Sequence, residues 1–90
     1  MKKTLYTIYD TVSQTFWIPF CAFNDRDAQR SVSNLVNQPS DTDVYLHPGD
    51  YMLESIAVFD DSDFPIISLI DPPKTICRLD SLKLSNPTEE

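Results

Sequence analysis

The sequence predicts an α+β fold: an antiparallel sheet of four to five strands with one helix packed on one face. Runs rich in Tyr, Thr, Ile and Val are separated by polar turns, which indicates strands, and one segment between them has apolar residues at helical spacing. The elements follow in the order β-β-α-β-β, and neighbouring strands joined by short turns favour antiparallel pairing. We expect residues 1–79 to form a single α+β domain and residues 80–90 to form a polar tail that frays.

The first two strands are expected at residues 3–10 and 16–23, joined by a polar turn at 11–15. Residues 3–10 combine β-branched and aromatic side chains, which favour a strand. The second strand contains Pro19, which has no N–H to donate to a neighbouring strand. We therefore expect residues 16–23 to lie at an edge of the sheet or to bulge at Pro19.

The helix is expected to begin after Asn24 and to end shortly before Pro39. The side chain of Asn24 can cap the first turn, and Asp27 three residues later approximates a capping box. Arg26 and Arg30 lie together on one face of this helix, away from the apolar stripe. That stripe, at helical spacing, consists of Ala28, Val32, Leu35 and Val36.

The second half of the chain alternates strands and turns: a loop at 40–50, the longest strand at 51–59, an acidic turn at 60–63 and a strand at 64–70. The Pro72–Pro73 pair is expected to break this last strand, because neither residue can donate to a sheet. Residues 74–79 then supply the optional fifth strand.

Aromatic residues are too numerous for one short helix to cover. Side chains alternate between the two faces of a strand, so these rings cannot all lie beneath the helix. We expect a partner, most simply a second copy in a twofold dimer, to cover part of the other face. The rings concerned are Tyr6, Tyr9, Phe16, Trp17, Phe20, Tyr51, Phe59 and Phe64.

The formal net charge is −7, from 7 basic and 14 acidic residues. This excess of acid argues against nonspecific binding to nucleic acid, which needs a basic surface, and suits solubility or a surface that imitates nucleic acid. The chain has no run of about 18 apolar residues. Asp10 also comes before any apolar stretch long enough for a signal peptide. We therefore expect a cytosolic protein with no membrane partner.

No group of residues indicates an enzyme, a cofactor or a metal. His47 is the one histidine, and no nucleophile or orienting partner is apparent near it. Cys21, Cys77 and His47 are too scattered for a zinc site, which needs about four ligands. The acidic turn at 60–63 lacks the Gly and the final Glu of a calcium loop. We expect two buried free thiols, with a Cys21–Cys77 disulfide as the minor alternative.

The sequence signal for nucleic acid is aromatic residues close to basic ones. Single-stranded DNA is held by bases that stack on rings and by cations that follow the phosphates. The competing interpretation places these rings in the core or in a dimer interface. The candidate DNA-binding residues are Lys2, Lys3, Tyr6, Trp17, Arg26 and Arg30.

Several short pieces occur in a fixed order over residues 3–83: LYTIYD at 5–10, Pro19-Phe20, Asn24-Asp25, Ala28 with Arg30, Pro48-x-Asp50-Tyr51-x-Leu53, and Ile56, Phe59 and Asp60. Together they resemble the small nonstructural protein of gokushoviruses, the microvirus-type single-stranded DNA phages. Ala57 stands where that family usually has Gly, and Val32 where an aromatic residue is common. The resemblance implies a role in phage DNA synthesis and carries a DNA-binding label, but it implies no active site.

Two functional classes follow. The first is a non-enzymatic accessory of phage DNA replication and single-stranded genome production, binding single-stranded DNA as a dimer in the host bacterial cytoplasm. The alternative is an acidic adaptor that engages the viral replication initiator, the procapsid or a host factor.

Overall fold

The computed structural model describes residues 2–84, and residue 1 and residues 85–90 are outside that description. The expected α+β fold is confirmed, with a five-stranded antiparallel sheet and one long helix. The elements are β1 (Lys2–Asp10), β2 (Thr15–Phe16), β3 (Phe20–Ala22), α1 (Asp25–Asn37), α2 (Asp43–Leu46), the 3-10 turn η1 (Pro48–Asp50), β4 (Tyr51–Asp60), β5 (Ile66–Arg78) and the 3-10 turn η2 (Leu79–Leu82).

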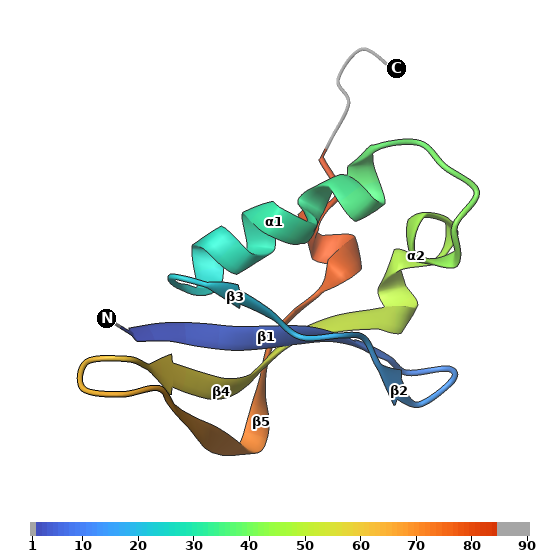
Figure 1. Ribbon diagram of the computed structural model, residues 1–90. Coiled ribbons are helices and arrows are strands. Elements are labelled where there is room, and N and C mark those ends of the chain that lie inside the picture. Colours follow the sequence, from blue (N-terminus) through green and yellow to red (C-terminus); the bar gives the residue numbers. More distant parts are fainter. Residues whose placement is uncertain (1, 85–90) are drawn as a thin grey trace.

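The sheet has the order β2-β1-β4-β5, and β3 also pairs with β1. β1 is therefore an inner strand, with β4 along one side and the short strands β2 and β3 along the other. Every pairing is antiparallel. Helices α1 and α2 and the turn η2 lie on one side of the sheet, while the β4–β5 hairpin extends away from them (Figure 1).

The strand expected at 16–23 is two strands separated by residues 17–19. Pro19 lies in the gap, so its missing N–H is not required by β1. The backbone N–H of Trp17 still donates to the carbonyl of Ile8, at 2.9 Å, which keeps this segment against β1. The expected position at an edge of the sheet is confirmed.

The expectation that Pro72–Pro73 would end a strand is wrong. One strand, β5, runs from Ile66 to Arg78 through both prolines. The register with β4 shifts there, from Leu69 opposite Ala57 to Lys74 opposite Ser55. Among the described strands β5 pairs with β4 alone, so one side of its backbone is unpaired. A proline there is tolerated when the side that lacks the N–H faces away from β4. The sheet still has five strands, because the single strand expected at 16–23 is divided into β2 and β3.

Helix α1 begins at the expected cap. The Asn24 side chain accepts a hydrogen bond from the backbone N–H of Asp27 at 2.8 Å. The expected stripe faces the sheet, with three of its residues buried and Leu35 half-buried against them. The core beneath the helix includes Tyr6, Ile8, Leu53 and Leu79, each no more than 2% exposed.

Two segments are more ordered than the sequence indicated. The loop expected at 40–50 contains α2 and η1, and Val44 of α2 is buried in the core. Residues 80–82, expected in the tail, belong to η2, and this turn packs against the core through Leu82. Asn37 secures this end: its amide donates to the carbonyl of Leu82, and its carbonyl oxygen accepts from the backbone N–H of Leu84. The rest of the expected tail, residues 85–90, lies outside the described residues.

The cap at Asn24 gives a first prediction. Asn24→Ala leaves an N–H of the first turn of α1 without its side-chain acceptor. We expect the free energy of unfolding to fall by about 1 kcal/mol, measured by urea denaturation. Asn34→Ala, at an exposed position within the same helix, is the control. It should be neutral or slightly stabilising, because Ala favours a helix interior. An equal loss in both variants would contradict the role of the cap.

Candidate functional site

An open groove of about 460 Å³ lies between α1 and the sheet edge formed by β3 and the start of β1. Three separate parts of the chain meet there. β1 contributes Lys3, the end of β3 and the following residue contribute Cys21, Ala22 and Phe23, and α1 contributes Asp27, Arg30 and Ser31. Residues three and four apart on a helix share one face, so the α1 residues line the groove together.

The groove combines an exposed ring with two cations. Phe23 is 61% exposed, although it is a large apolar side chain. The Lys3 ammonium lies 5.2 Å from the centre of this ring, a cation–π contact. Arg30 lines the same groove from the helix, and Asp27, also on α1, is the one acidic residue of this lining. The lining therefore has a small positive excess in a strongly acidic protein.

This groove continues along α1 through two further depressions. The first, about 340 Å³, shares Ser31 with it and is otherwise lined by apolar residues including Trp17 and Leu35. The second, about 480 Å³, shares Trp17 and Leu35 and extends to the segment between α1 and α2. Together they form a track beside the helix, hereafter the α1 groove. From Asp27 to Gln38 its length is about 17 Å, at 1.5 Å per helical residue.

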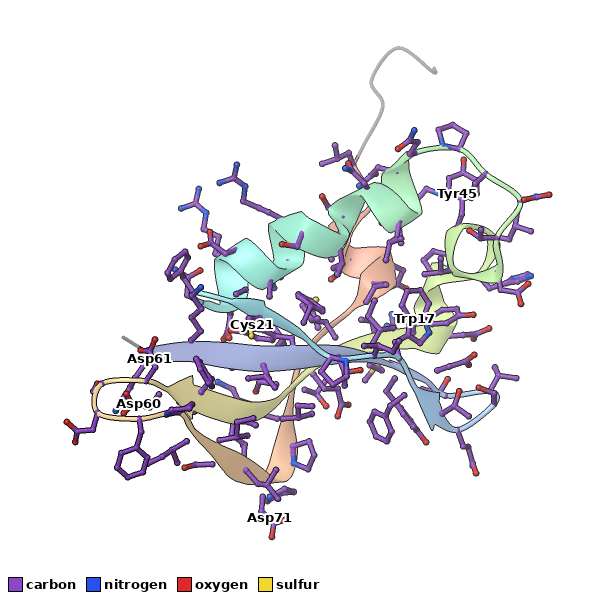
Figure 2. The ribbon with its side chains drawn as sticks, in the orientation of Figure 1. Trp17, Cys21, Tyr45, Asp60, Asp61 and Asp71 are labelled. Carbon is purple, nitrogen blue, oxygen red and sulfur yellow. The ribbon has the colours of Figure 1, made fainter. Side chains whose placement is uncertain are left out.

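Trp17 lies in the middle of the α1 groove and is 38% exposed. Its ring packs edge-on against Tyr51, with 6.0 Å between the ring centres. Its carbonyl accepts a hydrogen bond from the Thr7 hydroxyl at 2.7 Å, which fixes the backbone at this point. Figure 2 shows Trp17 well apart from Cys21, which marks the Phe23 end of the groove.

Tyr6 cannot act as a stacking platform, and this part of the sequence-based prediction is wrong. The ring is 1% exposed and lies beside Phe20. Its hydroxyl donates to the carboxylate of Asp25 at 2.8 Å. Burial, followed by this hydrogen bond, raises the pKa of Tyr6 to about 12. Its place opposite Ser55 in the β1–β4 ladder turns it toward the core.

The structure separates the predicted basic residues. Lys3 and Arg30 line the groove, but Lys2 and Arg26 do not. Lys2 lies opposite Asp60 in the β1–β4 ladder, and Arg26 is exposed on the first turn of α1. Phe23 is the groove residue that sequence reasoning missed. The sequence feature that could have identified Phe23 is its position directly before the cap residue Asn24, one residue after the last pair between β3 and β1.

The expectation of two buried thiols holds for neither cysteine. Cys21 is exposed in the groove and Cys77 is half-buried, and both are free. His47 is exposed and joins α2 to η1, where its backbone N–H donates to the carbonyl of Asp43. Within residues 2–84, no group of three or more His, Cys, Asp or Glu side chains is placed to hold a metal ion.

The fold and the groove define a small α+β domain with an open groove beside its long helix. None of the helices described has the length and apolar character needed to cross a membrane. A family model described as Phage ORF5 protein matches residues 3–82. The chain therefore belongs to the phage ORF5 protein family. No curated protein and no solved structure matches it.

The buried phenol gives a second prediction. Because the pKa of Tyr6 is raised, the native state keeps a proton that the unfolded chain loses near pH 10. This contribution to stability is complete below about pH 10 and is lost as the pH rises toward about 12. Tyr6→Phe removes it, so the variant should lose about 1 kcal/mol at neutral pH. Its stability should then decline less steeply in alkali, measured by urea denaturation across pH.

Tyr45→Phe is the control for this measurement, because Tyr45 lies on α2 away from Asp25. It should keep the alkaline decline of the wild type. An unchanged decline in Tyr6→Phe would contradict the assignment.

Proposed function

We propose that this member of the phage ORF5 family is a non-enzymatic accessory of phage DNA replication and single-stranded genome production in the host bacterial cytoplasm. In this proposal it binds single-stranded DNA, as a dimer, along the α1 groove. The observation that carries the proposal is the exposed ring of Phe23, which lies under the Lys3 ammonium in a groove that Arg30 also lines. An exposed ring in a groove lined by two cations is the kind of arrangement that holds an unpaired base and its phosphates.

The groove supplies both kinds of contact that a single strand needs. Phe23 at one end and Trp17 in the middle offer ring surface to successive bases. Lys3 and Arg30, which line the Phe23 end of the groove, are the side chains proposed to contact the adjoining phosphates. Stacking contributes about 1–3 kcal/mol per base and tolerates any sequence, because every base has a π-face. The groove therefore favours single strands without base-specific recognition.

The charge of the protein limits where DNA can bind. With a formal net charge of −7 the protein as a whole repels phosphate, so DNA needs a local positive excess such as the lining formed by Lys3, Arg30 and Asp27. Binding in this proposal is therefore confined to the groove and weakens with added salt. The resemblance to the gokushovirus protein supports the same process, since single-stranded genome production exposes unpaired DNA.

The alternative function is an acidic adaptor that engages the replication initiator, the procapsid or a host factor. The observation in its favour is the same net charge, combined with large exposed apolar side chains such as Ile18, which is 91% exposed. Protein interfaces use apolar anchors inside a polar rim, whereas phosphate contacts need cations. The two functions therefore depend on different residues and can be separated by mutation.

The third prediction tests the DNA groove. Phe23→Ala should weaken binding to an oligothymidylate of about 16 nucleotides by about 1–3 kcal/mol, measured by fluorescence anisotropy at low salt. Phe16→Ala is the matched control, because Phe16 is 57% exposed and is not a groove residue. It should bind like the wild type.

The same assay across about 50–200 mM salt tests the cations. Arg30→Gln should reduce the slope of log affinity against log salt by about 0.7, one phosphate contact to a single strand. Arg78→Gln is the control, because Arg78 is exposed and forms an ion pair with Asp80 at 3.1 Å. No binding of the wild type at low salt would remove the DNA proposal and leave the adaptor.

A further inference from the structure

The first half of β5 has the composition of a buried strand but is exposed. Residues 66–70 read Ile-Ile-Ser-Leu-Ile. Ile66 is 47% exposed, Ile67 59% and Leu69 80%, and Phe64 just before them is 66% exposed. Apolar residues at successive positions point to both faces of a strand, a pattern typical of strands covered on both sides. A run of this kind left in water needs a partner.

The position of β5 leaves its backbone open as well. β5 is the last strand in the order β2-β1-β4-β5 and pairs with β4 alone among the described strands. Ile66 to Leu69 lie opposite Asp60 to Ala57 in that ladder. Their outer side therefore presents backbone N–H and C=O groups that another strand can pair with.

The two halves of β5 differ in how this edge is protected. The second half has the features that prevent strands from adding to an edge: a shift of register, Pro72, Pro73 and the charged Lys74. Figure 2 shows Asp71 at the bend between the two halves. Residues 66–70 contain no proline and no charge, and residues 66–69 pair with β4 without a shift of register. This apolar part of the edge therefore lacks the features that protect the second half.

We propose that residues 66–70 are the interface at which a second copy of this chain adds to the sheet, antiparallel, about a twofold axis at Ser68. In this register Ile67 lies opposite the partner's Leu69, and Ile66 lies opposite the partner's Ile70. The pairing continues the sheet from one protomer into the other and removes both apolar edges from water.

The sequence of this segment selects a second copy over another partner. Its polarity is symmetric about Ser68, with two apolar residues on each side. In a twofold antiparallel pair centred on Ser68, apolar residues therefore lie opposite apolar residues and serine lies opposite serine. The segment also has no ionisable side chain, so two molecules with a formal net charge of −7 meet without like charges in contact.

This inference names the interface of the proposed dimer and does not depend on DNA binding. β5 and the α1 groove adjoin opposite edges of the sheet. A dimer joined at β5 therefore leaves both grooves open, and two linked grooves can bind one strand more tightly than either does alone.

The first test is oligomeric state without DNA. The wild type should change from monomer to dimer with rising micromolar concentration in sedimentation equilibrium. Leu69→Lys should remain monomeric, with a circular dichroism spectrum unchanged from the wild type. Val12→Lys is the matched control and should dimerise, because Val12 is 73% exposed in the β1–β2 turn. A monomeric wild type throughout, or a dimeric Leu69→Lys, would overturn the proposal.

The second test does not require a disruptive substitution. In a chain carrying Cys21→Ser and Cys77→Ala, Ser68→Cys places one thiol on the proposed axis. Directly opposite residues in an antiparallel pair have Cβ atoms about 4.5–5.5 Å apart, so mild oxidation should link two chains. Ser62→Cys, in the turn between β4 and β5, is the control and should link far more slowly. Equal rates for the two variants would overturn the register.

Discussion

The pairing of β1 with β4 is the constraint on which the rest of the structure depends. The ladder holds Ile8 opposite Leu53, and both side chains lie in one buried cluster with Val32 of α1. Residues two apart on a strand share a face, so the same register directs Tyr6 and Tyr51 toward this core. A shift of one residue would turn all of these side chains to the opposite face. The position of α1, and of the groove beside it, follows from this register.

The α1 groove exists because one edge of the sheet is interrupted. β2 and β3 pair with separate parts of β1, and the three residues between them leave the ladder at Pro19. Trp17 turns there toward the helix instead of lying in a continuous strand. At the other end, β3 stops at Ala22, so Phe23 projects into water beside Lys3. The two exposed rings of the groove, Trp17 and Phe23, therefore come from places where regular strand pairing ends.

The two edges of the sheet provide different surfaces. The β2–β3 edge adjoins the groove with its cations and rings, whereas residues 66–70 of β5 at the other edge present an uncharged, mostly apolar segment. A strongly acidic protein binds an anion most readily at a local positive excess, and two copies of it meet with the least repulsion where charge is absent. The two proposals, DNA binding and self-association, therefore place their sites at opposite edges of the sheet, where neither would compete with the other.

The sequence alone determined the elements whose signals are local. The Asn24 cap, the apolar stripe of α1 and the edge position of the Pro19 segment follow from hydrogen bonding and periodicity within a few residues. Of the candidate site it identified Lys3, Arg30 and Trp17, but it also included Tyr6, which the core encloses. Tertiary structure decided which face of β1 is buried, that β5 continues through Pro72–Pro73, and that Phe23 lies in water. The reason is that burial and strand continuity depend on the neighbouring strand, and that neighbour is set by pairing between residues far apart in the chain.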